Sequence, residues 1–215
     1  MIDLYPAILT DSSETFERQI RAAERFAPLL HIDVTDGRFV PTRSVGVADL
    51  RAVAPNVPFE IHLMVERPED VVADFLALGP KRIIVHKSAT ASVAQVCGMI
   101  RAADVEASIA VSPATLSDDI TPSLHLVQQV TFLAVDPGFQ GGALNAGVLQ
   151  KARLFKHDHP EIPVEVDGGI KTTNWEQVLA TAADRYVIGS GIWQTANPAA
   201  TYQEFVRRAT VTTTP

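Results

Sequence analysis

Residues 28–37, Pro-Leu-Leu-His-Ile-Asp-Val-Thr-Asp-Gly, form an apolar run that ends in a turn signal. The run predicts a buried strand, and side chains two residues apart share one strand face, so we expect His31 and Asp33 to lie together near its end. The stretches at residues 59–64, Phe-Glu-Ile-His-Leu-Met, and 164–169, Val-Glu-Val-Asp-Gly-Gly, end in a similar way. Three strands therefore each carry an ionisable or metal-binding side chain near the end, which is typical of a site on a parallel α/β protein.

Short apolar runs alternate with amphipathic stretches along the whole chain. The runs lie near residues 2–8, 28–34, 58–63, 81–86, 106–111, 130–135, 163–167 and 185–188. Helical patterns cover residues 12–26, 69–78, 88–103, 146–156, 173–183 and 199–208, and weaker ones lie at 47–53 and 116–127. Asp11 and Glu14 have the spacing of a capping box at the start of the first helix.

This alternation predicts an α/β protein with a single (β/α)8 barrel, and the alternative is a doubly wound open sheet. A closed barrel is favoured because no dinucleotide-binding fingerprint follows the first strand. Candidate functional groups also follow strands two, three, six, seven and eight, whereas an open sheet gathers its ligands at one switch point. We assign the barrel to residues 1–209 and a short C-terminal tail to residues 210–215.

Composition and charge narrow the possible partners. The 215 residues suffice for one domain with a large core, and 47% hydrophobic and 20% charged residues are ordinary for a globular protein. A net charge of −7 argues against nucleic acid or an anionic membrane surface as a partner, but it is compatible with a small anionic substrate. The sequence shows no signal-peptide pattern and no membrane span, so we expect a cytoplasmic protein.

Four side chains near predicted strand ends have the chemistry of a metal site: His31, Asp33, His62 and Asp167. Two imidazoles and two carboxylates suit one divalent ion such as Zn²⁺, Mn²⁺, Fe²⁺ or Co²⁺. Each residue alone could be an ordinary hydrogen-bonded polar group, but the four together favour a metal. Two carboxylates also suit acid–base chemistry in which one removes a proton and the other returns it. His86, at the end of the fourth strand, is expected to support the site or to anchor a loop.

Glycine-rich segments follow the last three predicted strands, at residues 135–142, 167–169 and 188–191. Glycine lets backbone N–H groups approach an anion closely, so the three segments predict a phosphate-binding cradle at this end of the barrel. At any one of them, ordinary turn glycine is the alternative. Met64 lies two residues beyond His62, so we expect both on the same strand face.

Together these motifs resemble those of the ribulose-phosphate 3-epimerase family. The resemblance runs in order from about residue 4 to residue 205 and rests on residues 31–41, on 62–64, 137–139 and 166–169, and on Gly189-Ser190. It implies a (β/α)8 barrel isomerase that acts on carbohydrates and inverts C3 of a ketose phosphate through a cis-enediolate. The implied pair is typically D-ribulose 5-phosphate and D-xylulose 5-phosphate, and the implied assembly is a homo-oligomer, either a dimer or a hexamer.

The resemblance also implies roles for individual residues. Asp33 and Asp167 match the catalytic acid–base pair, and the metal ligands match His31, Asp33, His62 and Asp167. The residues that match substrate- and phosphate-binding positions are His62, Gly138, Phe139, Gln140, Gly141, Gly168, Gly169, Gly189 and Ser190.

The expected pocket wall departs from the family pattern. Ala7 replaces a serine, Thr35 and Leu133 replace methionines, Arg38 replaces a histidine, and Met64 is kept. Arg38 could pair with an extra anionic or hydroxyl-rich part of a substrate. The substrate is therefore D-ribulose 5-phosphate or a different ketose phosphate, such as a tetrulose or hexulose phosphate. A non-catalytic sugar-phosphate-binding barrel is a further alternative, although binding alone does not require two aspartates.

Overall fold

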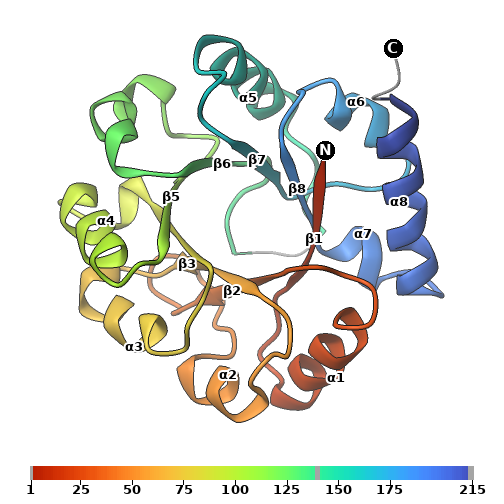
Figure 1. Cartoon of the computed structure of the whole chain (residues 1–215), viewed down its shortest axis with the longest axis horizontal. Coiled ribbons are helices and arrows are strands. Elements are labelled where there is room, and N and C mark those ends of the chain that lie inside the picture. Colours follow the sequence, from red (N-terminus) through yellow and green to blue (C-terminus); the bar gives the residue numbers. More distant parts are fainter. Residues whose placement is uncertain (1, 139–140, 213–215) are drawn as a thin grey trace.

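Eight parallel strands close into a barrel in the computed structural model of the chain, which describes residues 2–138 and 141–212. The strands are β1 (Asp3–Ile8), β2 (Leu30–Thr35), β3 (Phe59–Met64), β4 (Arg82–His86), β5 (Glu106–Val111), β6 (Gln129–Leu133), β7 (Val164–Asp167) and β8 (Arg185–Ile188). Each strand pairs with the next one in sequence, and β8 pairs with β1 (Figure 1). The predicted (β/α)8 barrel is confirmed, and the open-sheet alternative is wrong.

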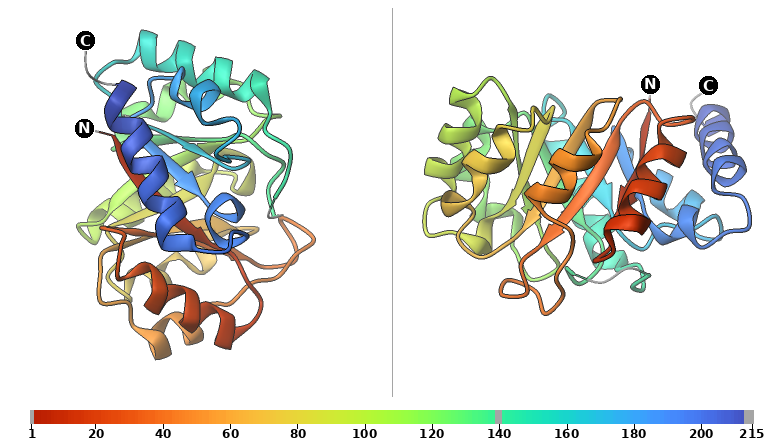
Figure 2. Two further views of the ribbon diagram at one scale, coloured as in Figure 1. Left: turned by 90° about the vertical axis from the view of Figure 1, so that its right-hand side faces the viewer. Right: turned by 90° about the horizontal axis from the view of Figure 1, so that it is seen from below.

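Helices surround the barrel, and the strands that form its wall are tilted (Figures 1 and 2). The α-helices are α1 (Ser13–Ala23), α2 (Val47–Val53), α3 (Val72–Leu76), α4 (Val93–Ala102), α5 (Ala146–Asp158), α6 (Trp175–Leu179), α7 (Ser190–Trp193) and α8 (Pro198–Thr212). The short 3-10 helices are η1 (Pro68–Asp70), η2 (Lys87–Ala89), η3 (Ser117–Asp119) and η4 (Thr121–Leu126). The connection from β5 to β6 contains η3 and η4, and Pro122 lies in the first turn of η4, where its missing N–H removes no helical hydrogen bond.

Capping side chains decide where two of the helices begin. Ser12 caps α1 because its side chain accepts a hydrogen bond from a backbone N–H in the first turn, so the predicted cap at Asp11 is wrong by one residue. Ser92 caps α4 in the same way. The helix predicted over residues 88–103 is therefore shorter at its start, where the chain forms η2 and then an extended residue, Thr90.

The C-terminal helix extends further than the sequence pattern indicates. α8 reaches Thr212 and so includes the first residues of the predicted tail, while residues 213–215 lie outside the described part of the chain. Within the residues that the structure describes, no helix combines the length and the apolar character that a membrane crossing needs.

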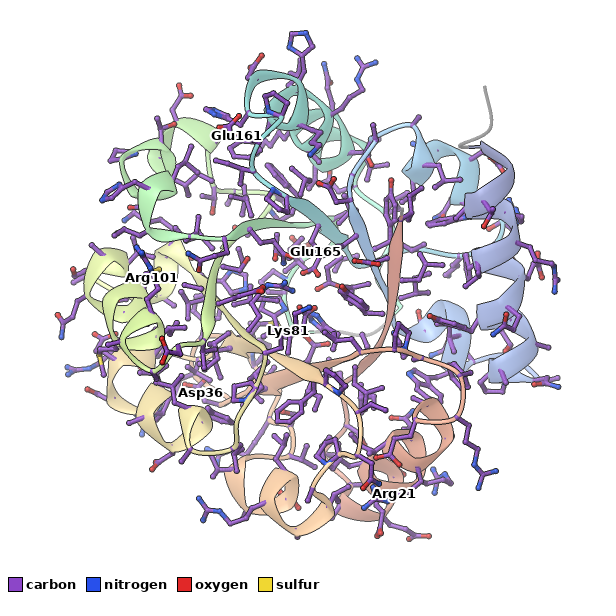
Figure 3. All side chains as sticks on the ribbon, in the orientation of Figure 1. Arg21, Asp36, Lys81, Arg101, Glu161 and Glu165 are labelled. Atoms are coloured by element: carbon purple, nitrogen blue, oxygen red, sulfur yellow. The ribbon has the colours of Figure 1, made fainter. Side chains whose placement is uncertain are left out.

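Alternate residues of each strand face two different environments. Apolar side chains such as Ile32, Ile61 and Ile83 belong to the main core, which also contains buried residues of the surrounding helices. Their neighbours in sequence include carboxyl groups that are completely buried, such as those of Glu60 and Glu165. Figure 3 shows Glu165 inside the ring of strands. The barrel interior therefore contains buried ionisable groups beside a small apolar cluster that includes Tyr5 and Val187, while the main apolar core lies between the strands and the helices.

An arginine neutralises much of this buried charge. Arg82 forms ion pairs with Glu60 and Glu106. Burial alone would raise the pKa of Glu60, but the hydrogen bond to His31 and the nearby positive charges lower it to about 2. Burial and the charge of Glu60 together raise the pKa of Glu165 to about 8, so Glu165 is protonated at neutral pH. The interior thus holds one ionised carboxylate paired with Arg82 beside a second carboxyl group that stays neutral.

We expect Arg82→Met to lower the free energy of unfolding by about 3–5 kcal/mol, because Glu60 would be left buried without its cation. Urea unfolding measures this change. The matched control is Arg67→Met, which breaks an exposed ion pair with Asp70 and should lower the free energy of unfolding far less. Equal stability of the two variants would contradict a structural role for the buried pair.

Candidate active site

The four predicted metal ligands come from three strands. β2 carries His31 and Asp33, β3 carries His62, and β7 carries Asp167. Pairing of β2 with β3 places Asp33 opposite His62, whereas Asp167 reaches them only because the barrel closes. One possible ligand atom from each residue lies within 4.8 Å of the others. Strand register and closure together bring the predicted set into one cluster.

Each imidazole has one nitrogen that faces both carboxylates. His31 Nε2 lies 3.3 Å from Asp33 Oδ1 and 3.8 Å from Asp167 Oδ2. His62 Nδ1 lies 3.1 Å and 3.5 Å from the same two oxygens. Both histidines are completely buried, whereas Asp33 and Asp167 are 7% and 6% exposed. The carboxylates are therefore the part of the cluster that a ligand can reach.

His31 uses its other ring nitrogen to contact the charged interior. Its Nδ1 lies 2.7 Å from Glu60 Oε1. An ionised carboxylate only accepts hydrogen bonds, so Nδ1 donates its proton to Glu60. The Nε2 atom has no hydrogen-bond partner among the described residues. When Nε2 gives up its proton, His31 presents the Nε2 lone pair to the cluster, as in carboxylate–histidine–metal arrangements.

The charges of the cluster suit a divalent ion. Burial alone would lower the pKa of His31, but the charge of Asp33 raises it well above its usual value. Burial opposes protonation of His62 as well, yet hydrogen bonds to Asp167 and Asp33 raise its pKa to about 9. Two imidazolium protons therefore balance two carboxylates in the metal-free site. A divalent ion brings the same two positive charges, so these residues could hold one.

A pocket at the carboxyl ends of the strands exposes both aspartates. The sequence-predicted residues that line it are Ala7, Asp33, Met64, Leu133, Gly138, Gly141, Asp167, Gly168, Gly169, Gly189 and Ser190. The buried His31 and His62 do not line it, and Phe139 and Gln140 lie outside the described residues. One pocket thus joins the candidate acid–base pair to most of the candidate phosphate-binding residues.

Two residues expected in the pocket wall lie elsewhere. Thr35 is buried and Arg38 is exposed, and both line a separate groove together with Arg43 and Arg67. Arg38 does not line the pocket that contains the aspartates. The altered residues that do face the pocket are Ala7 and Leu133.

The glycines of the pocket are not equivalent. Gly169 has a φ of +71°, and a Cβ atom there would lie 2.8 Å from Leu144 Cα, so the backbone itself requires glycine. Gly189 has a φ of −91°, and the nearest atom to an added Cβ would be Ala7 Cβ at an ordinary 3.6 Å. A Cβ atom at position 189 would therefore have room, which makes this position the better test of close ligand approach.

His86 contacts the cluster directly. Its Nε2 lies 2.9 Å from His62 Nε2, and the two rings are nearly parallel, with an interplanar angle of 18°. Burial and the positive charge of His62 lower the pKa of His86 well below its usual value, so His86 is neutral. This position agrees with the expectation that His86 supports the site.

Sequence reasoning missed Glu60 and Arg82, the residues behind His31. A signal was present, because both are charged residues inside apolar strand runs. Glu60 lies two residues before His62, and Arg82 lies four residues before His86, so each shares a strand face with a residue of the site. Charged residues at that spacing indicate a polar barrel interior.

The barrel and its cluster define a class of protein: a (β/α)8 barrel with two accessible carboxylates at a site that could hold a metal ion. Residues 3–193 match the family model described as the Ribulose-phosphate 3 epimerase family. The ribulose-phosphate 3-epimerase of Aquifex aeolicus is 32% identical over 197 residues, which cover 88% of this chain and 89% of that protein. The chain therefore belongs to the ribulose-phosphate 3-epimerase family, whose members are isomerases acting on carbohydrates.

Other comparisons agree with this assignment. The ribulose-phosphate 3-epimerase of Mycobacterium tuberculosis is 33% identical over 195 residues, covering 87% of this chain and 85% of that protein. A solved 3-hexulose-6-phosphate synthase has a TM-score of 0.72 at 19% identity, covering 97% and 99% of the two chains. The solved structure of KGPDC from Streptococcus mutans has a TM-score of 0.75 at 15% identity, covering 98% of each chain. The two solved structures show that the fold is shared.

We expect the affinity of the metal-free protein for Zn²⁺ to increase with pH up to about 9, because the ion must displace a His62 proton whose pKa is about 9. Calorimetric titrations in buffers of different ionisation enthalpy measure both the affinity and the protons released. His125→Asn removes an exposed histidine and should leave the pH dependence unchanged. An affinity that is constant between about pH 6 and about pH 8 would contradict the prediction.

Proposed function

We propose that this protein is a metal-dependent epimerase that inverts C3 of a ketose phosphate, with D-ribulose 5-phosphate and D-xylulose 5-phosphate as the preferred pair. The observation that carries the proposal is the placement of Asp33 and Asp167. Both carboxylates reach one pocket, and both face the same two imidazole nitrogens at 3.1–3.8 Å. The relatives named ribulose-phosphate 3-epimerase support the same reaction.

The two aspartates would share the proton transfers. A C3 proton beside a ketone is weakly acidic, so its removal needs a base and stabilisation of the negative charge that develops on the substrate. Asp33 would take the proton from one side of the carbon, and Asp167 would deliver a proton to the other side. The roles reverse for the other epimer. One aspartate must therefore be ionised and the other protonated when a turnover begins.

The same cluster would hold the metal. His31, Asp33, His62 and Asp167 would be the ligands, and Zn²⁺, Mn²⁺, Fe²⁺ and Co²⁺ all accept such a set. When bound, the ion would supply Lewis-acid stabilisation of negative charge on the substrate. Glu60 would hold His31 in the orientation that directs Nε2 to the cluster.

The phosphate group would lie at the glycine-rich side of the pocket. Gly141, Gly169, Gly189 and Ser190 line the same pocket as the aspartates. Glycine permits backbone N–H groups to approach phosphate oxygens, and the Ser190 hydroxyl adds one more possible donor. A ketose phosphate bound in this way would have its phosphate and its C3 atom at two ends of one pocket.

The pocket wall supports a second candidate, the same reaction on a different ketose phosphate such as a tetrulose or hexulose phosphate. Ala7 and Leu133 line the pocket where the resemblance leads us to expect serine and methionine. Assays of a panel of ketose phosphates separate the candidates. Good turnover of another sugar beside negligible turnover of D-ribulose 5-phosphate would favour the second candidate.

We expect Asp33→Asn and Asp167→Asn each to lower kcat for epimerisation by roughly 100- to 10,000-fold, because each removes one proton-transfer group. In heavy water, the wild-type protein should introduce deuterium at C3, and each variant should lose this exchange in at least one substrate direction. NMR of the sugar phosphate measures both effects.

The matched control for the aspartate variants is Asp74→Asn, which changes an exposed carboxylate of α3 and should keep full activity. Metal content measured on every variant separates loss of the acid–base group from loss of the ion. Exchange at C1 in place of C3 would indicate aldose–ketose isomerisation and would overturn the proposed reaction.

We expect Gly189→Ala to raise KM for the sugar phosphate about tenfold, equivalent to about 1.4 kcal/mol, because the added methyl group would keep phosphate away from the backbone. The structure leaves room for the Cβ atom, and urea unfolding of the variant separates a loss of stability from a loss of phosphate binding. Gly46→Ala, where an added Cβ would meet nothing within 4 Å, is the control. An unchanged KM would place the phosphate elsewhere.

A further inference from the structure

The contact between His62 and His86 has a direction that the structure allows us to assign. The two Nε2 atoms lie 2.9 Å apart, so one ring must donate a proton and the other must accept it. Both side chains are completely buried, and Phe39 packs near His86 with ring centroids 4.9 Å apart. Neither ring can exchange this partner for solvent without a change in packing.

The other nitrogen of His62 decides between the two directions. Nδ1 lies 3.1 Å from Asp33 Oδ1 and is the atom that faces the carboxylates. If His62 Nε2 accepted the proton of His86, the only proton of a neutral His62 would lie on Nδ1, and no lone pair would face the cluster. If His62 Nε2 donates to His86, the lone pair of a neutral His62 lies on Nδ1.

We propose that His86 is a positioning residue: it accepts a hydrogen bond from His62 Nε2 and so keeps Nδ1 of His62 available as the ligand atom for a metal ion that Asp33 and Asp167 would also hold. This inference rests on the proposed function, because it concerns a metal ligand of that site. His86 then carries its own proton on Nδ1, which has no hydrogen-bond partner among the described residues. The fold thus leaves one buried donor of His86 unpaired while its Nε2 holds His62.

Each of the two histidines of the cluster would be oriented by a hydrogen bond from its second ring nitrogen, and the two acceptors differ in charge. Glu60 holds His31 with a negative charge, and Arg82 neutralises that charge. His86 holds His62 with a neutral acceptor, which needs no buried cation of its own. A neutral acceptor also adds no charge, so the two negative charges of the aspartates would still match the two positive charges of a divalent ion.

The experiment compares two substitutions of His86 in the full chain. His86→Phe keeps an aromatic ring but has no acceptor, whereas His86→Gln carries an amide oxygen that can replace Nε2 as the acceptor. We expect His86→Phe to weaken Zn²⁺ binding roughly 10- to 100-fold and His86→Gln to restore most of the affinity. Val85→Ala, which truncates a neighbouring core residue of β4, should lower stability and leave Zn²⁺ affinity unchanged.

A spectroscopic measurement gives the direction of the hydrogen bond. Spectra of ¹⁵N-histidine-labelled protein, with and without Zn²⁺, should show a proton on His62 Nε2 and none on His86 Nε2. The proton signal of His62 Nε2 should shift or broaden in His86→Phe and persist in His86→Gln.

Three outcomes would overturn the inference: a proton on His86 Nε2, equal Zn²⁺ affinity of wild type and His86→Phe, or weak binding by both His86 variants. Failure of the wild-type protein to bind Zn²⁺ would instead contradict the proposed metal site. The spectra of the metal-free protein would still decide whether His86 accepts from His62.

Discussion

The buried hydrogen bond between His31 Nδ1 and Glu60 Oε1, at 2.7 Å, is the interaction on which the candidate site depends. It fixes which nitrogen of His31 is protonated, and therefore which nitrogen faces the aspartates. Glu60 remains ionised in the barrel because Arg82 lies against its other oxygen. The buried ion pair of Glu60 and Arg82 thus orients His31 in the site. The main apolar core lies on the outer side of the strands.

The cluster of His31, Asp33, His62 and Asp167 brings groups of opposite charge close together. Asp33 and Asp167 bring two carboxylates to the pocket, and the imidazoles of His31 and His62 lie buried behind them. Two protons or one divalent ion can balance these carboxylates, so proton binding and metal binding compete for the same atoms. The same competition links the charge of the site to the acid–base chemistry that two aspartates can perform.

The fold alone does not determine this chemistry. Solved structures with TM-scores of 0.72 and 0.75 share the barrel at 19% and 15% identity, and their names differ from those of the family to which the chain belongs. A (β/α)8 barrel supplies positions at the carboxyl ends of its strands, and the residues at those positions determine the reaction. In this chain the residues that we propose for this role are His31 and Asp33 of β2, His62 of β3 and Asp167 of β7.

Local patterns in the sequence determined the strands, the shared face of His31 and Asp33, and the candidate ligand set, because strand periodicity and turn residues act over a few positions. The start of α1 depended on which of two adjacent polar side chains reaches a free backbone N–H, and that choice needs backbone geometry. Only the closed barrel brought Asp167 to β2, placed His86 against His62 and placed Arg38 in a separate groove. Those contacts join residues far apart in the chain, so strand register, barrel closure and loop paths decided them.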